Sequence, residues 1–219
     1  TLNMFGKIYL FLLNILRSSR FFTYHLWGIK INKYCHTTFW DLTSLVIKKE
    51  LNATKEKKYL DMGCGQFALL GQFYKKKYVD SIVMSVDIYE DLVENSAANS
   101  KINNNEIKII QSNLFANINE KFDLISFNPP YVPQKKDDNV KYSKIRYSGD
   151  NGTETMSLFL QVAKNFLLKD GKIILGVNSY YVDKEKCLSL IEKHGFVVKK
   201  ITRILFNTSI AFLIQENSK

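Results

Sequence analysis

One short motif in this chain has the residue types needed to hold and orient a planar nitrogen group: Asn128-Pro129-Pro130-Tyr131. Proline lacks a backbone N–H and has a fixed φ, so the segment is predicted to be a stiff loop that presents carbonyl oxygens. Together with the side-chain oxygen of Asn128, these oxygens could accept both hydrogens of an –NH2 group. Tyr131 adds a flat aromatic face on which an amide or a base can stack.

Such an arrangement favours chemistry at an amide or aryl amine nitrogen, whose delocalised lone pair makes it a poor nucleophile. Two acceptors on its hydrogens would favour pyramidalisation and stabilise the positive charge that grows on nitrogen. The predicted catalytic residues are therefore Asn128, Pro129 and Tyr131. The motif contains no Asp, Glu or His, so we assign no general base and expect the proton to leave through Asn128 or to water.

A second group of residues could hold a cofactor. Glycines in Asp61-Met62-Gly63-Cys64-Gly65 would let the backbone pass close to a ligand. Alone, this pattern is weak, and Ala68 at the place of a third glycine leaves NAD possible. Asp87 follows Gly65 by 22 residues, a spacing suited to an acid that accepts hydrogen bonds from ribose hydroxyls, although a helix cap is the alternative. The predicted cofactor-binding residues are Asp61, Gly63, Cys64, Gly65, Asp87, Ile88, Asn113, Leu114 and Asn128.

The elements that must position these residues alternate between strand and helix. Apolar runs predict strands at residues 58–62, 81–87, 107–111, 122–127 and 171–177, and helices at 68–77, 91–101, 153–168 and 183–194. Two further strands, 197–206 and 209–215, are joined by a predicted turn at Asn207-Thr208. We expect an α/β fold: a Rossmann-like, doubly wound, mostly parallel seven-stranded sheet with an antiparallel C-terminal strand. Ligands in such sheets bind at the carboxyl ends of the strands.

The first part of the chain differs from the rest. Residues 1–50 are rich in aromatics and predicted to be a short helical cap, with a helix running from Trp40 to Glu50, and residues 51–219 form the main domain. The apolar stretch from Ile8 to Leu16 is too short to span a bilayer, which needs roughly 20 apolar residues. We expect no integral membrane span, and a buried helix that packs on the domain or covers its cleft rather than a membrane-surface helix.

Composition limits the function class only loosely. The 219 residues are 46% hydrophobic and carry a formal charge of +10, which fits a nucleic-acid partner or a compositional bias toward lysine equally well. The cysteines Cys35, Cys64 and Cys187 are far apart, so we predict no metal site and no disulfide framework. A reducing, cytoplasmic setting is expected.

The motifs together resemble a known family. Asp61-x-Gly63-x-Gly65, Asp87, Asn113 and the proline motif occur in this order, each after a predicted strand. This is similar to class I S-adenosylmethionine methyltransferases of the Asn-Pro-Pro-Tyr group, over roughly residues 57–215. The group includes release-factor glutamine methyltransferases and enzymes that methylate exocyclic amines of adenine or guanine. The resemblance implies S-adenosyl-L-methionine as cofactor, with Gly63, Gly65 and Asp87 at its methionine and ribose parts and Asn113 at its adenine.

The resemblance has a second segment and two departures. Gly149-Asp150-Asn151-Gly152-Thr153-Glu154 resembles the glycine-rich segment of the release-factor enzymes. Asn113 stands where Asp is common, and Phe67 where many members have glycine. The implied activity is N-methylation of a planar amide or amine, and the implied acceptor is a protein glutamine of a release factor.

Several alternatives stay open. The methyl acceptor could be a nucleobase amine in RNA or DNA, or a small-molecule amine, and the chain could be a catalytically silent binding subunit or, with less support, a nicotinamide oxidoreductase. The region before the cofactor domain, about 57 residues, is shorter than the helical substrate-binding domain of the bacterial enzymes. An activating partner subunit is possible, and residues 134–147 are a candidate substrate-contacting loop.

Overall fold

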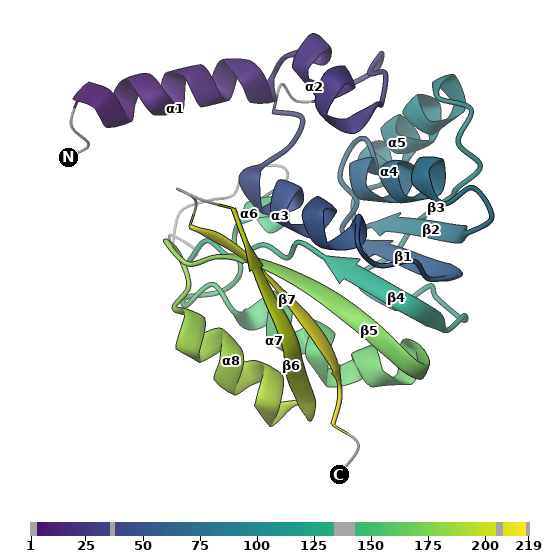
Figure 1. The fold of residues 1–219 in the computed structure, drawn as a ribbon, viewed down its shortest axis with the longest axis vertical. Coiled ribbons are helices and arrows are strands. Elements are labelled where there is room, and N and C mark those ends of the chain that lie inside the picture. Colours follow the sequence, from purple (N-terminus) through teal and green to yellow (C-terminus); the bar gives the residue numbers. More distant parts are fainter. Residues whose placement is uncertain (1–3, 36–37, 134–142, 205–207, 218–219) are drawn as a thin grey trace.

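The computed structural model describes residues 4–35, 38–133, 143–204 and 208–217. In this part of the chain a seven-stranded sheet has the order β3-β2-β1-β4-β5-β7-β6 (Figure 1). The strands are β1 (Lys58–Met62), β2 (Ile82–Asp87), β3 (Lys108–Gln111), β4 (Phe122–Phe127), β5 (Leu167–Asn178), β6 (Phe196–Arg203) and β7 (Ser209–Glu216).

Strand pairing confirms the predicted fold class. The strands from β1 to β5 pair in parallel, and β7 is antiparallel to both β5 and β6. The order of the strands reverses at β1, which pairs with β2 on one side and β4 on the other. In open α/β sheets a ligand crevice forms outside the carboxyl ends of the strands at this point.

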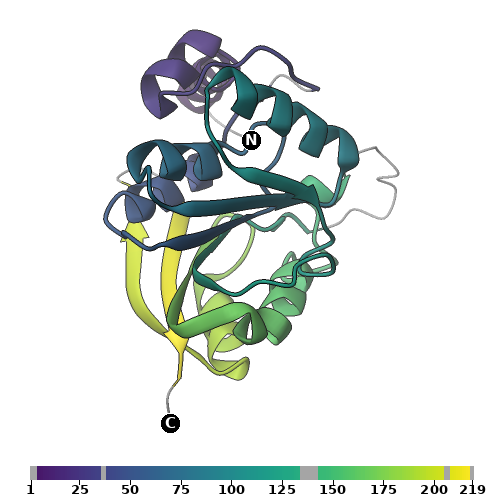
Figure 2. The same ribbon diagram turned by 90° about the vertical axis from the view of Figure 1, so that its right-hand side faces the viewer.

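Helices cover both faces of the sheet (Figures 1 and 2). One apolar core joins α7 and α8 to β-strand residues such as Leu60 and Ile125, and the other joins α3 and α4 to Tyr59 and Leu124. Neighbouring strand residues therefore enter opposite cores, as the two-residue period of a strand requires. The helices are α1 (Met4–Arg17), α2 (Arg20–Trp27), α3 (Leu42–Leu51), α4 (Leu69–Lys77), α5 (Glu90–Ile102), α6 (Ser143–Arg146), α7 (Glu154–Ala163) and α8 (Lys184–Lys193).

Helix α3 is held tightly against the sheet. It lies so close to β5 that a Cβ built on Gly176 would be 2.6 Å from Ile47 Cδ1. Near the C-terminal end of the helix, the buried Glu50 carboxylate receives Lys200 Nζ at 2.8 Å and the hydroxyl of Thr202 at 2.6 Å. At the N-terminal end of the helix, the Thr43 hydroxyl donates to Ser209 Oγ of β7 at 2.9 Å, which holds the neighbouring Asp41 beside the carboxyl ends of β4 and β5.

Some predicted boundaries were wrong. The helix predicted for residues 153–168 ends at Ala163, a 3₁₀ turn follows, and β5 already begins at Leu167. Leu167 pairs with Phe122 of β4, so sheet pairing overrides the helical pattern there. The helix predicted from Trp40 begins at Leu42, because Asp41 caps it. Asn207 of the predicted turn lies outside the described residues.

The stretch from Ile8 to Leu16 is helical, as predicted, but it is not buried. Its side chains Ile8, Phe11, Leu12 and Ile15 are 48% to 65% exposed. Only the opposite side faces the protein, where Leu16 packs against the core beside α3 and Leu13 borders a cavity. Helix α1 lies at the outside of the domain (Figure 1), and none of the elements described packs on its outer face. Within the described ranges, no helix has the length and apolar character to cross a membrane.

Candidate active site

A cavity of about 1310 Å³ opens at the carboxyl ends of β1, β2, β4 and β5. Its walls include residues from every motif singled out in the sequence, from Asp61 to Glu154, although these two residues lie 93 positions apart in the chain. The predicted site residues that border it are Asp61, Gly63, Cys64, Gly65, Asp87, Ile88, Asn113, Leu114, Asn128, Pro129 and Tyr131. The fold therefore brings the predicted cofactor-binding residues and the predicted catalytic residues together around one cavity. The role of each residue is a proposal.

The conformation of the loop after β1 is set by the left-handed backbone of Gly65 and by a hydrogen bond to Asp87. Gly65 has φ +64°, and a Cβ built there would meet no atom within 4 Å. Glycine is therefore required by the left-handed backbone, and the space above it is free for a ligand. Asp87 Oδ2 accepts the Gly65 N–H at 2.9 Å, and Asp87 Oδ1 accepts the Tyr89 N–H at 3.1 Å. Asp87 thus couples the end of β2 to the glycine loop.

Asp61 lies at the floor of the cavity and is 1% exposed. Its Oδ2 accepts the Gly71 N–H of α4 at 3.0 Å. Burial raises the pKa of this carboxyl to about 7, with a further contribution from the nearby Asp87 charge, although the Gly71 hydrogen bond opposes the rise. The carboxyl is thus poised to ionise when a cation binds beside it.

The raised pKa of Asp61 predicts a pH-dependent stability. The folded chain retains a proton that the unfolded chain loses above about pH 4, so this group lowers the free energy of unfolding as pH rises from about 4 to about 7. Asp61→Asn keeps an acceptor for Gly71 and removes the titration. Urea unfolding across this pH range should show a flatter profile in the variant than in the parent, and identical profiles would contradict the assignment.

The turn after β3 forms another wall. Ser112 Oγ donates to the Leu114 carbonyl at 2.7 Å and holds Leu114 at φ +48°. This strained turn directs exposed Asn113 and half-buried Leu114 to the cavity. Phe67, the departure from the family pattern, packs edge-to-face against Phe39 with ring centroids 5.2 Å apart. The Phe67 ring therefore ties the N-terminal segment to the domain.

Asn128 is oriented by an acid that the sequence interpretation missed. Its Nδ2 donates to Asp41 Oδ1 at 3.2 Å and Oδ2 at 3.1 Å. Both carboxylate oxygens are acceptors, so the NH2 end of the amide must face Asp41 and the oxygen must face away. Asn128 Oδ1 is buried and has no hydrogen-bond partner among the described residues. A buried acceptor left without a donor is costly, which makes it a ready site for a ligand N–H.

Tyr131 is fixed by the same acid. Its hydroxyl donates to Asp41 Oδ2 at 3.2 Å and lies 3.1 Å from Thr43 Oγ1. Burial, together with the Asp41 charge, raises the pKa of this phenol well above its usual range, so it stays protonated as a donor. The Tyr131 ring stacks against Tyr181 with centroids 6.0 Å apart, and Tyr181 in turn meets the exposed Tyr180 edge-on. The tyrosines form an aromatic wall at the cavity mouth.

The glycine-rich segment packs directly on the proline motif. Val132 N–H donates to the Arg146 carbonyl at 3.0 Å, and Ser148 N–H donates to the Val132 carbonyl at 3.0 Å. A Cβ on Gly152 would be 2.4 Å from the Tyr131 carbonyl oxygen, so only glycine permits this approach. Residues 134–142 of the predicted substrate loop lie outside the described part of the chain, whereas Ile145, Arg146 and Tyr147 border the cavity.

The N-terminal segment is tied to the glycine loop and to α5. The side chain of Gln66, next to Gly65, accepts the Cys35 N–H at 2.6 Å. Asn99 of α5 and Asn103, the residue that caps the C-terminal end of this helix, use their side-chain oxygens to accept the N–H groups of Asn32 and Lys30 at 2.9 and 2.8 Å. Amide side chains spaced one helical turn apart thus dock this segment as an extended strap beside the cavity.

Two signals in the sequence could have revealed the missed residues. Tyr180 and Tyr181 follow the fifth strand, the same position that identified the other motifs. Asp41 precedes a helix with Ser44 three residues on, a typical capping position, and accepts the Ser44 N–H at 2.7 Å. A helix that begins at Trp40 would place Asp41 inside the helix, whereas a helix that begins at Leu42 makes Asp41 its N-cap.

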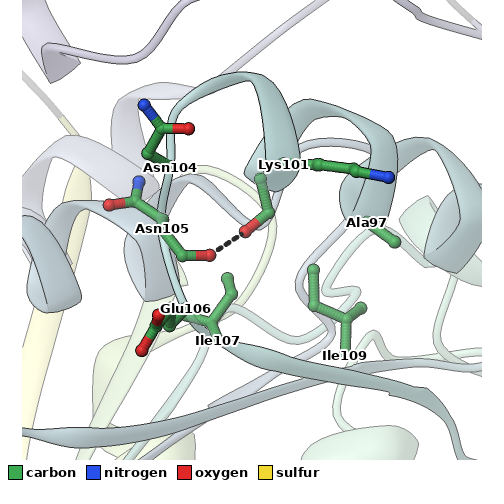
Figure 3. Close-up of a pocket in the computed structure, with 8 residues that line it drawn as sticks. Ala97, Lys101, Asn104, Asn105, Glu106, Ile107 and Ile109 are labelled. Carbon is green, nitrogen blue, oxygen red and sulfur yellow. Dashed lines mark hydrogen bonds between the residues drawn. The ribbon is translucent and has the colours of Figure 1, made fainter.

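A second, shallower hollow of about 530 Å³ lies between the end of α5 and the start of β3 (Figure 3). Its walls include Lys101, Asn104, Glu106 and Ile109, and the Ser100 hydroxyl donates to the Asn105 carbonyl at 2.7 Å within it. None of the predicted site residues borders this hollow, so the main cavity is the candidate active site.

The residues of the main cavity fit the cofactor that the resemblance implies. The open space over Gly65 admits a ligand close to the backbone, and the carboxylates of Asp61 and Asp87 suit an ammonium group and ribose hydroxyls. Leu114 and Ile88 supply apolar contacts for a base, and Asn113 supplies an amide edge. Gly63, Gly65 and Asp87 would hold the methionine and ribose parts.

Comparisons with known proteins identify the family of this chain. A family model described as methyltransferase small domain matches residues 30–201. A protein of Methanocaldococcus jannaschii assigned as a protein N5-glutamine methyltransferase is 32% identical over 163 residues, which covers 74% of this chain and 81% of the relative. The release factor glutamine methyltransferase of Haemophilus influenzae is 26% identical, and the match covers 61% of this chain but only 53% of that enzyme.

Solved structures show the same fold. A methyltransferase from Pyrococcus furiosus matches with a TM-score of 0.69 at 22% identity, covering 95% of this chain and 98% of that one. An S-adenosylmethionine-dependent methyltransferase from Clostridium acetobutylicum matches with a TM-score of 0.61 at 14% identity, covering 99% and 100%. At these identities the likeness concerns the fold alone.

Proposed function

Because this chain belongs to the methyltransferase small domain family and is an S-adenosylmethionine-dependent methyltransferase, we propose that it methylates the side-chain amide nitrogen of a protein glutamine. A translation release factor is the first substrate to test, since relatives carry that name. The observation that carries the proposal is the buried Asn128 Oδ1 at the cavity wall, for which the described part of the chain offers no hydrogen-bond donor.

The residues of the chain would divide the work between binding and orientation. When bound, S-adenosylmethionine supplies a methyl group on a sulfonium, which the acceptor nitrogen takes as the carbon–sulfur bond breaks. Asn128 Oδ1 would accept one N–H of the acceptor amide, and the proton displaced from the nitrogen would pass to Asn128 or to water. Holding that N–H favours a pyramidal nitrogen and stabilises its developing positive charge. The remaining contribution is positioning of the nitrogen in line with the methyl group.

The aromatic wall supports a planar acceptor. The Tyr131 hydroxyl is already engaged by Asp41 and Thr43, so the contribution of Tyr131 to a substrate is its ring. Tyr180 is 77% exposed at the cavity mouth and is available to pack on an incoming chain. Aromatic faces of this kind bind flat groups such as a primary amide or a base.

Binding of the cofactor should depend on Asp87. Asp87→Ala removes the acceptor of the Gly65 N–H and a partner for the ribose, so the Kd for S-adenosylmethionine should rise by about tenfold to a hundredfold. Calorimetric titration checks this, with Glu90→Ala as a matched control because Glu90 is an exposed acid outside the cavity. NADH in parallel should not bind. An unchanged Kd in Asp87→Ala would remove Asp87 from the cofactor site.

The identity of the methyl acceptor is tested by offering the chain two classes of substrate separately. The purified chain is incubated with methyl-labelled S-adenosylmethionine and either a release factor or total RNA, at low and at moderate salt. We expect label in the release factor, at a glutamine located by mass spectrometry, and loss of label when that glutamine is replaced by alanine. Label in RNA that falls steeply with salt would instead support the nucleobase alternative, for which the formal charge of +10 is the favouring observation.

A further inference from the structure

Helix α1 presents an apolar stripe that the described part of the protein leaves uncovered. Ile8, Phe11, Leu12 and Ile15 are 48%, 65%, 54% and 49% exposed. Their spacing of three, four and seven residues places them on one face of an α-helix. Figures 1 and 2 show α1 and α2 outside the layers of the sheet domain, with α1 projecting as a rod. Four large exposed side chains in one row are unusual for a surface that faces only water.

Helix α2 continues the apolar character of this region. Phe21 is 65% exposed, and Phe22, Tyr24 and Leu26 are 43%, 45% and 37% exposed. The helix is nevertheless anchored on the domain, since Trp27 is only 2% exposed and Thr23 is fully buried. The inner side of α1 is also occupied, because Leu16 packs on the core and Arg17 Nε donates to the Trp40 carbonyl at 2.7 Å. Both helices therefore have a fixed inner side and an apolar outer side.

The charge of this region is entirely positive. Residues 1–40 contain Lys7, Arg17, Arg20, Lys30 and Lys33 and no aspartate or glutamate; the first acid of the chain is Asp41. Exposed Arg20, Lys30 and Lys33 lie on or just after α2. An apolar helical stripe with flanking cations and no acids is the composition of helices that lie in the headgroup region of a membrane. Each cation near an anionic leaflet adds to the attraction.

Other occupants of the stripe fit less well. The described helix of 14 residues is about 21 Å long, shorter than the roughly 30 Å of a bilayer core, so its length fits a helix that lies along a membrane surface. A second copy of this chain would bring two acid-free, positively charged segments together. Nucleic acid would pair with the cations and leave the exposed aromatic and aliphatic side chains in water.

We propose that α1 docks this enzyme on a membrane surface rich in anionic lipid, with Ile8, Phe11, Leu12 and Ile15 inserted among the headgroups and acyl chains. The inner side of the same helix borders the active-site cavity through Leu13, Asn14 and Arg17. Docking would therefore hold the cavity mouth near the membrane without using any residue assigned to the cofactor or the acceptor.

Co-sedimentation with vesicles tests the proposal. The full chain is mixed with vesicles of phosphatidylcholine alone or with about one third phosphatidylglycerol, at about 0.1 M salt. We expect at least about tenfold stronger partitioning to the anionic vesicles, and weaker binding as salt rises. The double variant Phe11→Ser/Ile15→Ser should lose about tenfold of this binding. The matched control Val79→Ser/Ile102→Ser, also at exposed apolar positions, should bind as the parent does.

A fluorescence measurement separates insertion from surface attraction. The native Trp27 and Trp40 are 2% and 8% exposed, so a new tryptophan in Phe11→Trp reports on α1. Its emission should shift to the blue with anionic vesicles and be quenched by brominated acyl chains. The proposal is overturned if the emission does not change, or if anionic and neutral vesicles bind alike. It is also overturned if the serine pair binds as tightly as its control, or if sedimentation velocity shows a dimer that the serine pair abolishes.

Discussion

Replacing Asn128 by alanine is expected to lower kcat for methyl transfer by about a thousandfold, or roughly 4 kcal/mol, and to leave S-adenosylmethionine affinity nearly unchanged. Asn128 Oδ1 is the buried acceptor aimed away from Asp41, and loss of one such group from a preorganised site typically costs about a hundredfold to a thousandfold. Single-turnover methyl transfer measures the rate, and calorimetry measures the affinity. Retained full activity would contradict the proposed role.

A matched variant separates this effect from a general loss of packing. Asn113→Ala removes the same amide from another residue that borders the cavity, but from the wall assigned to adenine. We expect it to raise the Kd for S-adenosylmethionine and to leave kcat at saturating cofactor close to that of the parent. Equal losses of kcat in both variants would show that any asparagine of the cavity wall is needed for folding of the site rather than for the transfer step.

Replacing Asp41 by asparagine is expected to lower kcat by about a hundredfold through Asn128, without contact between Asp41 and the substrate. Asp41 accepts hydrogen bonds from Ser44, Asn128 and Tyr131, and these hold the motif in one orientation. An asparagine there still caps the helix, but its NH2 group would oppose that of Asn128 and release the amide to rotate. The thermal midpoint should change little, while kcat falls and cofactor affinity stays.

A double-mutant cycle tests whether Asp41 acts by positioning Asn128. If Asp41 acts by orienting Asn128, Asp41→Asn should have little further effect on kcat once Asn128 is alanine. The control is Ser44→Ala, which keeps the Ser44 N–H on Asp41. It removes the hydroxyl, which donates to Asp41 at 2.7 Å and accepts from Asn128 Nδ2 at a long 3.4 Å, and it should cost less than about tenfold because Asp41 still holds Asn128. Full additivity of the two losses would mean that Asp41 and Asn128 act independently.

The parts of the fold that can be predicted from the sequence are those determined by the local pattern of apolar residues, glycines and prolines. Strand β1 was predicted at residues 58–62 and occurs at Lys58–Met62, because a short apolar run before glycines is a strong strand signal. The cofactor loop and the proline motif were found by the rule that ligands meet the carboxyl ends of parallel strands. The mostly parallel sheet with an antiparallel C-terminal strand followed from the alternation of strands and helices and from the terminal hairpin, whereas the order of the strands is visible only in the structure.

The parts that could not be predicted depend on contacts between distant segments. Asp41 and Asn128 are 87 residues apart, and the packing of α3 on the sheet, at Gly176 and through Glu50, places them together. Helix α7 ends early because Leu167 is recruited to pair with Phe122. The apolar stretch at Ile8 is helical as its pattern indicates, but periodicity does not reveal whether a partner covers the helix, and the described structure leaves it exposed.

The most direct test of the account is the chemical identity of the methylated product. A release factor labelled by this chain from methyl-labelled S-adenosylmethionine is hydrolysed in acid, and the volatile products are separated. Transfer to a side-chain amide nitrogen predicts labelled methylamine, in an amount equal to the label on the protein and absent with Asn128→Ala. Label released as methanol, as from a carboxyl ester, or label found only on nucleobases of co-purified RNA would contradict amide N-methylation by this site.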